Sequence, residues 1–297
     1  LFMLIDGISR KSIESNDNYE VKIIDQTILP HKLEYIDLKN FSDCCKAIKD
    51  MWVRGAPLIG ATAAYGMFFA LKENSSKKNI EYSFKKLLAT RPTAVDLKWA
   101  LENITDVILQ INENDRADHV WSIARKLEAD SIEQCSKIGD YGLEVIKSRI
   151  KNNKTFNILT HCNAGWLACV DWGTALAPIY KAYNSGLDIH VWVDETRPRS
   201  QGAALTAWEL SKHGVPNTLI VDNAGGHLMQ RGEVDICIVG SDRTAANGDV
   251  CNKIGTYMKA LCAFDNDIPF YVAIPESTID FKLKSGVNNI KIEERSH

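Results

Sequence analysis

A polar stretch that follows an apolar run carries several groups capable of acid–base chemistry. Residues 234–239 form an apolar, largely β-branched run that is typical of a buried strand, and the run breaks at Gly240 into SDRTAANGD, residues 241–249. This stretch offers two carboxylates, an arginine, an amide and hydroxyls. Within it, Asp242 could act as a general acid or base in apolar surroundings that raise its pKa, or it could be an ordinary loop or cap aspartate. Because open α/β sheets bind ligands beyond the carboxyl ends of their strands, we interpret this stretch as the floor of an active site.

A cysteine stands at the end of a second predicted strand. Cys162 directly follows the run at residues 156–161, and Gly165 comes soon after it, so its thiol is the one that we expect to face a ligand. A cysteine is otherwise most often a buried structural residue, which is our interpretation of the other seven. His161 precedes Cys162, but neighbouring residues on a strand point to opposite faces. We therefore expect His161 to pack or bond on the other side and not to serve as a base for Cys162.

Several basic or amide side chains stand at predicted helix starts, where backbone N–H groups attract anions. In RGAP, residues 54–57, proline suits the first turn of a helix and glycine lets a ligand approach the backbone. This segment is either an anion site or a plain helix–loop–helix with a surface arginine. Gln201 and the pair Asn252 and Lys253 open two later predicted helices in the same way. Arg91 ends another helix, a position that by itself is more often a solvated helix end.

The composition excludes several classes of protein. The chain has 297 residues, 45% hydrophobic and 25% charged, and a formal net charge of −3, which leaves no basic footprint for nucleic acid. No apolar run reaches the roughly 18 residues of a membrane helix. The first residues, LFMLIDGISRKS, are apolar, but the charged Asp6 interrupts them too early for a signal peptide. The eight cysteines form no C-x-x-C pair and do not cluster with the seven histidines, so we expect reduced thiols in a cytoplasmic protein and no metal site. The dinucleotide and P-loop motifs are missing, so no nucleotide cofactor is expected. The G-x-S-x-G elbow of the α/β-hydrolases is missing as well.

The spacing of apolar residues predicts a change of architecture near the middle of the chain. Before it, helical spacing recurs at 41–51, 57–67, 80–89, 97–111 and 120–138, with a strand at 21–30 and a helix break at Gly139 and Gly142. After a polar link at 151–154, strand-like runs at 156–161, 189–193, 217–221, 234–239 and 270–274 alternate with helical stretches at 174–183, 201–212, 225–230 and 252–264. Strands buried on both faces and separated by helices predict a parallel sheet. The predicted fold class is therefore α/β, with a mostly helical N-terminal domain (residues 1–150) that has a short β portion, followed by a Rossmann-like catalytic domain with a parallel sheet (residues 151–297).

The five predicted strands would send polar groups to one edge of this sheet. The residues just past them include Cys162, Asn163, Asp194, Glu195, Thr196, Arg197, Asp222, Asn223, Ser241, Asp242 and Glu276. Polar residues could follow one or two strands by chance, but polar residues after all five strands favour a ligand-binding or active site.

The same segments carry a family resemblance. The chain resembles the methylthioribose-1-phosphate isomerases, in the superfamily that includes the regulatory subunits of the translation-initiation guanine-nucleotide exchange factor. The similar segments are DQTILP (25–30), MWVRGAPLIGATAAYG (51–66), RPTAVDLKWAL (91–101), LTHCNAG (159–165), VDETRPRSQGAALTAWEL (193–210) and GSDRTAANGDVCNKIGTY (240–257). Cys162 and Asp242 together favour the isomerase branch, because the regulatory subunits do not keep that pair.

The resemblance implies conversion of the phosphorylated pentose 5-methylthioribose 1-phosphate to its ketose 1-phosphate in methionine salvage. It implies a homodimer that works without metal or other cofactor. It also implies that Asp242 is the proton donor and that Cys162 stabilises the transition state. The substrate-binding residues implied in the same way are Arg54, Gly55, Ala56, Arg91, Gln201, Asn252 and Lys253.

Some residues depart from the family pattern and leave alternatives open. Asp96 stands where the family usually has asparagine, Trp166 where a small residue is common, and Ser241 where alanine is common. Because Trp166 could narrow the sugar pocket beside Cys162, a 5-deoxyribose-1-phosphate isomerase is one alternative. A sugar-phosphate or nucleotide sensor without turnover is another, and a cysteine hydrolase or amidotransferase is a third, disfavoured because it lacks a suitable histidine. The chain ends at IEERSH, where the family continues, so we expect the last part of the fold to lie beyond this numbering.

Overall fold

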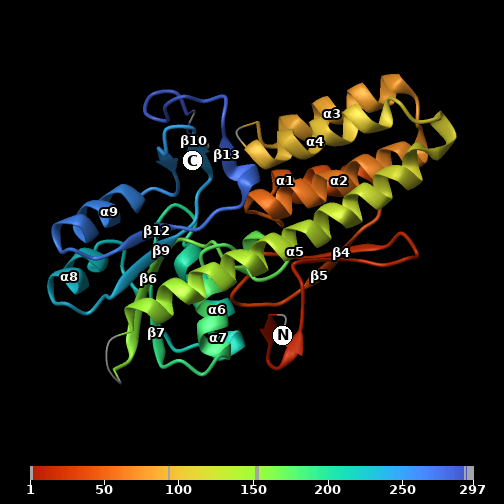
Figure 1. Cartoon of the computed structure of the whole chain (residues 1–297). Coiled ribbons are helices and arrows are strands. Elements are labelled where there is room, and N and C mark those ends of the chain that lie inside the picture. The colour runs from red at the N-terminus through yellow and green to blue at the C-terminus, as the bar shows by residue number, and fades with distance from the viewer. Residues whose placement is uncertain (1–2, 93, 151–153, 291, 293–297) are drawn as a thin grey trace.

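The computed structural model describes residues 3–92, 94–150, 154–290 and 292. Figure 1 shows a bundle of helices beside a sheet that carries helices on both faces, with the long helix α5 (Arg116–Arg149) running from one part to the other. This arrangement confirms the predicted α/β class, a helical N-terminal region followed by a Rossmann-like parallel sheet. Within the described ranges, no helix is both long and apolar enough to cross a membrane.

The N-terminal helices surround one buried helix. α1 (Phe41–Lys49), α3 (Lys77–Thr90) and α4 (Val95–Ile108) lie within a few residues of the predicted helices. α2 (Ala56–Glu73) runs among them, and all its residues from 58 to 71 are buried. A helix that is apolar on all sides is buried in this way.

Short strands complete the N-terminal part. The strand predicted at 21–30 is only β4 (Val21–Ile24), which pairs antiparallel with β3 (Ile13–Ser15) and β5 (Tyr35–Leu38). A hairpin of β1 (Leu4–Ile5) and β2 (Ile8–Ser9) precedes them. Single turns of 3-10 helix are η1 (Glu113–Asp115), η2 (Trp166–Ala168) and η4 (Glu276–Thr278).

Helix α5 is continuous where the sequence predicted a break. Its 34 residues pass through Gly139 and Gly142, and the packing of α6 (Ala177–Asn184) accounts for both glycines. A Cβ at Gly142 would lie 2.2 Å from Cγ of Pro178, and one at Gly139 would lie 3.0 Å from Cε of Lys181. The two glycines thus let α5 and α6 approach closely, although each costs the helix about 1 kcal/mol relative to alanine.

The parallel sheet has the strand order β12-β9-β6-β7-β8, and each pairing in it is parallel. Its strands, all close to their predicted positions, are β6 (Phe156–His161), β7 (Ile189–Asp194), β8 (Asn217–Ile220), β9 (Ile236–Val239) and β12 (Phe270–Val272). One face is covered by α6 and α7 (Trp208–His213) and the other by α8 (Ala224–Gln230) and α9 (Thr256–Asp265) (Figure 1). Neighbouring residues of β6 point to opposite faces of the sheet. Ile158 packs with α6 on one face, and Leu159 packs with α8 and α9 on the other.

Two predictions after β9 were wrong. The loop expected at 240–249 contains β10 (Arg243–Ala245), which pairs antiparallel with β11 (Val250–Cys251) and parallel with β13 (Ile279–Asp280). Helix α9 begins at Thr256 and not at residue 252, because Gly255 takes a left-handed φ of 103° and a Cβ there would lie 2.8 Å from the ring of His161. Both features depend on partners that are distant in the sequence.

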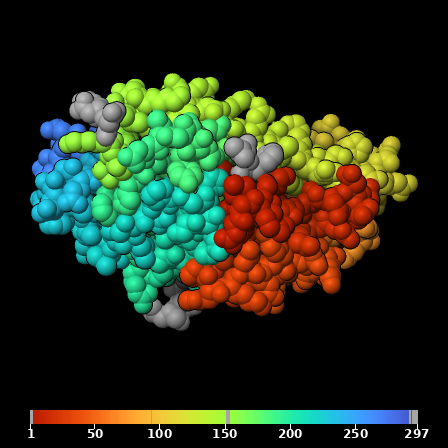
Figure 2. Space-filling model, turned by 90° about the horizontal axis from the view of Figure 1, so that it is seen from below, coloured from red at the N-terminus to blue at the C-terminus, as the bar shows by residue number. Residues whose placement is uncertain are grey.

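The domain boundary predicted after residue 150 stays a prediction, since residues 151–153 lie outside the described ranges. One hydrophobic core consists mainly of N-terminal residues. A second core consists mainly of residues of the parallel sheet and of the helices that pack on it. Met3 and Ile5 nevertheless pack in the second core, and the N–H of Leu4 donates to Nδ1 of His213 at 3.2 Å. Figure 2 shows this first segment side by side with residues of the sheet part.

Candidate active site

Cys162 is the first residue after β6, and its backbone has an uncommon conformation. Its φ of 63° lies in the left-handed region, which costs a residue other than glycine roughly 1 kcal/mol or more. Two long-range bonds hold it there: its N–H donates to the carbonyl of Asp194 at 3.3 Å, and its carbonyl accepts from Oγ1 of Thr206 at 2.5 Å. The thiol donates to Oε1 of Gln201 at 3.2 Å. Gln201 stands directly before the π-helical segment η3 (Gly202–Ala207), so the segment that follows β7 positions the thiol that follows β6.

The Cys162 thiol lies within reach of charges from three other segments. The residue is 5% exposed, and burial raises the pKa of the thiol. The cations of Arg54 and Lys253 lower this pKa, whereas the carboxylate of Asp242 raises it. Since the pKa is raised on balance, the thiol keeps its proton at neutral pH. The structure therefore brings Arg54, Gln201, Asp242 and Lys253 into the surroundings of Cys162, while their roles in a site stay predictions.

Arg54 stands two residues before the start of α2 and is held by the loop that follows Cys162. Its guanidinium donates to Oδ1 of Asn163 and, at 2.9 Å, to the Asn163 carbonyl. Gly55 follows with a φ of 87°, and a Cβ there would lie 2.2 Å from the carbonyl oxygen of Ala168. Helix α2 begins at Ala56, and among the described residues no side chain caps its start. The open N–H groups and the cation beside them have the character of an anion-binding site.

The hairpin of β10 and β11 joins Asp242 to the predicted substrate-binding pair. The N–H of Asp242 donates to the carbonyl of Cys251 at 2.9 Å, which ties the end of β9 to Asn252 and Lys253. The Asn252 amide donates to Oγ1 of Thr256 at 3.0 Å. Asp242 is exposed, so the described residues do not form the apolar surroundings that we considered for its carboxylate. Asn252 and Lys253 precede α9 instead of opening it, so they would contact an anion through their side chains.

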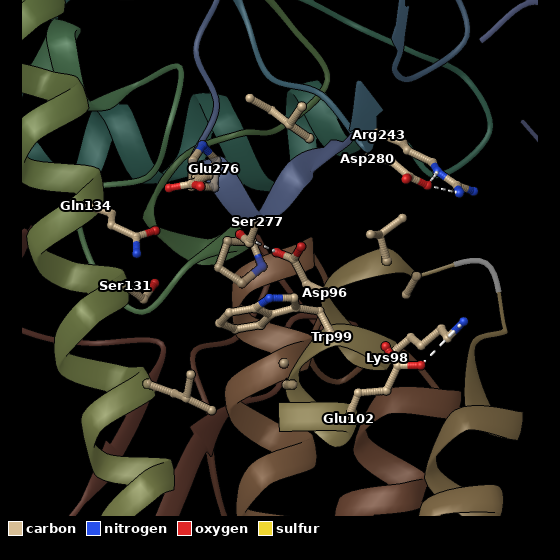
Figure 3. A pocket seen from close by; sticks show the side chains of 18 of the residues that line it. Asp96, Lys98, Trp99, Glu102, Ser131, Gln134, Arg243, Glu276, Ser277 and Asp280 are labelled. Atoms are coloured by element: carbon tan, nitrogen blue, oxygen red, sulfur yellow. Dashed lines mark hydrogen bonds and ion pairs between the residues drawn. The ribbon is translucent and has the colours of Figure 1, made fainter. Parts of the chain in front are cut away.

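A cavity of about 700 Å³ is lined by Arg243, the residue after Asp242, together with Asp96 and Ser277 (Figure 3). It lies between the helices α2, α4 and α5 on one side and β10, η4 and β13 on the other. The residues that come directly after Ala56, Arg91 and Asp242 line it, so it adjoins three predicted site residues. Within the part of the chain that the structure describes, neither Cys162 nor Asp242 lines this cavity. The cavity therefore flanks the predicted reaction centre.

Two polar pairs line the same cavity (Figure 3). Ser277 donates to Oδ2 of Asp96 at 3.4 Å, while Oδ1 of Asp96 has no hydrogen-bond partner among the described residues. Burial raises the pKa of Asp96, which is 3% exposed, to about 6. Arg243 forms an ion pair with Asp280, which fastens β10 to β13.

Other polar residues at the edge of the sheet serve the fold. His161 turns away from Cys162, as expected, because its Nδ1 lies 2.5 Å from Oδ2 of Asp194 and its Nε2 lies 2.8 Å from the carbonyl of Ile254. Lys259 also pairs with Asp194, at 3.0 Å. This buried group holds the chain just before α9. His161 is therefore not available as a base for Cys162, which disfavours the cysteine hydrolase and amidotransferase alternative.

Glu195 and Trp166 also lie outside the site. The Glu195 carboxylate accepts from the N–H groups of Gly202 and Ala203, at 2.9 and 2.8 Å, and so caps η3. Trp166 is fully buried and packs beside Trp208, with ring centroids 6.3 Å apart. It therefore does not narrow an open sugar pocket, contrary to what we considered from the sequence.

Thr206 and Glu209 are residues to which the sequence analysis gave no role. The amide nitrogen of Asn163 donates to Oγ1 of Thr206 at 3.0 Å and to Oε1 of Glu209 at 2.5 Å. Glu209 is fully buried. A signal for it exists in the sequence, because Glu209 follows Gln201 by about two helical turns and stands between two apolar residues, Trp208 and Leu210. A carboxylate at such a position is rarely buried without a partner.

The fold and this site define the class to which the chain belongs. The chain belongs to the initiation factor 2 subunit family, whose model matches residues 52–297. Within that class, it is 55% identical to the methylthioribose-1-phosphate isomerase of Paramagnetospirillum magneticum over 296 residues, which are 99% of this chain and 82% of that protein. The resemblance found from the sequence motifs is thereby confirmed.

Two solved structures support the same placement. The crystal structure of 5-methylthioribose 1-phosphate isomerase from Pyrococcus horikoshii matches with a TM-score of 0.85 and 39% identity, over 97% of this chain and 81% of that one. The translation initiation factor eIF-2B subunit delta from A. fulgidus matches with a TM-score of 0.82 and 39% identity, over 97% and 84%. The fold therefore occurs in proteins that carry both names.

Proposed function

We propose that this chain is an aldose–ketose isomerase that converts 5-methylthioribose 1-phosphate to 5-methylthioribulose 1-phosphate, a step of methionine salvage. The observation that carries the proposal is the buried thiol of Cys162, which donates to Gln201 and lies within reach of the charges of Arg54, Lys253 and Asp242. Relatives 54–56% identical to the chain carry the name of this enzyme, which favours the isomerase over the other members of the family.

The phosphate of the substrate is the group that the basic residues fit. A dianion next to the start of α2 gains from the helix dipole and from the Arg54 guanidinium, which offers paired N–H donors. The ammonium of Lys253 is a second cation that, like Arg54, lies within reach of the Cys162 thiol. The full set that we propose for substrate binding is Arg54, Gly55, Ala56, Arg91, Gln201, Asn252 and Lys253.

The chemical problem is the opening of the sugar ring. The phosphate sits on the anomeric oxygen, so the ring does not open spontaneously as that of a free aldose does. In our mechanism Asp242 donates a proton to the ring oxygen as its bond to C1 breaks, and Cys162 assists at C1 and C2 as a neutral thiol. A bound sugar would cover the Asp242 carboxyl and remove it from water. The hydrogen on C2 then moves to C1, and the C2 hydroxyl loses its proton as the C2 carbonyl forms, which restores the proton of Asp242. No atom is gained or lost overall.

A substrate labelled with deuterium at C2 distinguishes the two routes for this hydrogen. Retention of the label at C1 indicates hydride transfer, whereas loss of the label to water indicates an enediol. Either result is compatible with Asp242 as the acid at the ring oxygen.

The decisive assay compares 5-methylthioribose 1-phosphate with 5-deoxyribose 1-phosphate. Turnover of the first with the higher kcat/KM supports the proposal, and a preference for the second would reassign the chain to the 5-deoxyribose branch. The burial of Trp166 removes the main reason for that branch.

A sugar-phosphate or nucleotide sensor is the second candidate, favoured by the similarity to the eIF-2B subunit delta from A. fulgidus. Binding of a phosphorylated pentose without any ketose product would establish it. The thiol of Cys162 within reach of the Asp242 carboxylate argues for turnover instead, since a sensor needs only the cations.

We also propose that the protein is a cytoplasmic homodimer. All eight cysteines are free, which suits a reducing compartment. Light scattering of the purified protein would test the dimer, and a monomer at micromolar concentration would contradict it.

A further inference from the structure

The buried carboxyl of Glu209 lies behind Arg54, and one residue, Asn163, joins them. Arg54 donates to Oδ1 of Asn163, and Nδ2 of the same amide donates to Oε1 of Glu209 at 2.5 Å. All three residues are buried. The mechanism proposed above gives Glu209 no part. A buried carboxyl is costly unless it is hydrogen-bonded, so the partners of Glu209 define its role.

The contacts of the Asn163 amide require one orientation. A guanidinium only donates, so the amide oxygen must face Arg54 and the amide nitrogen must find acceptors on the other side. Thr206 uses its hydroxyl hydrogen on the Cys162 carbonyl, at 2.5 Å, and can therefore accept from Asn163. Glu209 is the second acceptor. The carboxyl thus selects the orientation of the amide that presents its oxygen to Arg54.

The carboxyl also fits tightly against the loop after β6. A Cβ at Gly165 would lie 1.8 Å from Oε1 of Glu209, and the N–H of Leu167 donates to Oε2 at 3.4 Å. Glu209 therefore connects the loop that carries Cys162 and Asn163 with the helix that follows Gln201. Little room remains for the carboxyl to move.

The charge of Arg54 stays available to a ligand in this arrangement. Its two bonds to Asn163 go to a neutral residue. Burial raises the pKa of Glu209 to about 8, despite the opposing effects of Asn163, Leu167 and Arg54. At neutral pH the carboxyl is therefore mostly uncharged and does not neutralise the guanidinium in front of it.

We propose that Glu209 is a positioning residue that aims the guanidinium of Arg54 at the substrate phosphate by fixing the Asn163 amide between them. Glu209 acts through Asn163 and does not touch the substrate. This inference rests on the proposed function only in taking Arg54 as a phosphate ligand.

The test is Glu209→Gln, which keeps the size of the side chain and changes its hydrogen bonding. A glutamine that presents its oxygen to Asn163 places its NH₂ against the N–H of Leu167, where two donors meet, whereas the hydroxyl oxygen of a protonated carboxyl can still accept from that N–H. The opposite orientation places NH₂ against Nδ2 of Asn163 and turns the Asn163 oxygen away from Arg54. We expect KM for 5-methylthioribose 1-phosphate to rise about 10-fold or more and kcat to fall by a smaller factor.

A double-mutant cycle separates positioning from general loosening of the fold. With Arg54→Ala already in place, Glu209→Gln should raise KM less than 2-fold further, because the residue it positions is gone. The matched control is Glu128→Gln, another buried glutamate, whose carboxylate accepts from Tyr65 and Ser15 at 2.7 and 2.9 Å in the N-terminal core. It should lower the melting temperature and leave KM unchanged. An unchanged KM in folded Glu209→Gln, or a full further rise in the double variant, overturns the inference.

Inorganic phosphate provides a readout that does not need turnover. Titration calorimetry should give a dissociation constant for phosphate about 10-fold weaker in Glu209→Gln than in the unmodified protein. If the unmodified protein binds phosphate but turns over no sugar, the proposed function fails while this inference is still tested by the phosphate affinities. Should Glu209→Gln not fold, Asn163→Ala breaks the same connection, and equal phosphate affinity in that variant would overturn the inference.

Discussion

The thiol of Cys162 donates to Oε1 of Gln201 across 3.2 Å, although the two residues stand 39 positions apart. The sheet explains the meeting, because β6 and β7 are adjacent and parallel and their carboxyl ends lie at one edge. Cys162 follows the first strand, and Gln201 precedes the helix that follows the second. The bond directs the thiol hydrogen to an amide oxygen, while burial raises the pKa of the thiol.

Replacement of this thiol tests whether it acts in catalysis. Cys162→Ala should lower kcat at least about 100-fold while KM changes little, since the cations that hold the phosphate remain. Steady-state kinetics measure both values. Cys237→Ala is the control, because Cys237 is buried in β9 on the face covered by α8 and α9. It should lower stability without a comparable loss of kcat, and an equal loss in both variants would remove Cys162 from its role.

The carboxyl of Asp242 is tested against a second carboxyl from the same hairpin. Asp242→Asn should lose at least about 100-fold in kcat, because an amide cannot deliver the proton to the ring oxygen. Asp249 instead accepts from the N–H of Gly286 at 2.8 Å and from Ser285 at 3.1 Å, so Asp249→Asn should affect turnover little. Near-normal turnover of Asp242→Asn would exclude it as the acid.

The glycine beside Arg54 allows a comparison of backbone strain with steric clash. Gly55 and Gly7 both have left-handed φ values, 87° and 81°, but only a Cβ at Gly55 meets other atoms, 2.2 Å from the Ala168 carbonyl. Gly7→Ala should therefore cost only the strain, about 1 kcal/mol of unfolding free energy. Gly55→Ala should cost at least ~1 kcal/mol more and raise KM as well, since the start of α2 must move. Urea unfolding and kinetics on both variants would measure this, and equal losses of stability would contradict it.

Asp96 makes stability depend on pH in a definite direction. Its pKa is about 6 in the folded protein against an ordinary 3.8, so between these values the folded state keeps a proton that the unfolded state has released. The resulting stabilisation is complete below about pH 4 and is lost as pH rises through 6. Asp96→Asn removes this dependence. We compare the free energy of unfolding of the variant with that of the unmodified protein. The difference in favour of the variant should be roughly 2–3 kcal/mol larger at pH 7 than at pH 4.

Unfolding in urea at pH 4, 5, 6 and 7 measures this difference. Asp106→Asn, an exposed position of the same helix α4, is the control and should show no such trend. A constant difference between Asp96→Asn and the unmodified protein across these pH values would show that the carboxyl at this position is not perturbed.

The order of helices and strands follows from local patterns in the sequence. The apolar run at 156–161 and the helical spacing at 80–89 indicate which faces of a strand and a helix are buried. Burial of apolar faces is the dominant favourable contribution to the folding free energy. The end of β6 at His161 and the start of α2 at Ala56 could accordingly be predicted, and with them the sites of Cys162 and Arg54.

Only the tertiary structure decided what joins these positions. The continuity of α5 through Gly142 depends on Pro178, and the pairing of β10 depends on β13, partners that no local window contains. The sequence places Glu209 between two apolar residues, but its position behind Asn163 arises from two chain segments that meet at one sheet edge. Residue types with the right chemistry are a property of the sequence, whereas the hydrogen bonds that orient them are long-range contacts that exist only in the folded chain.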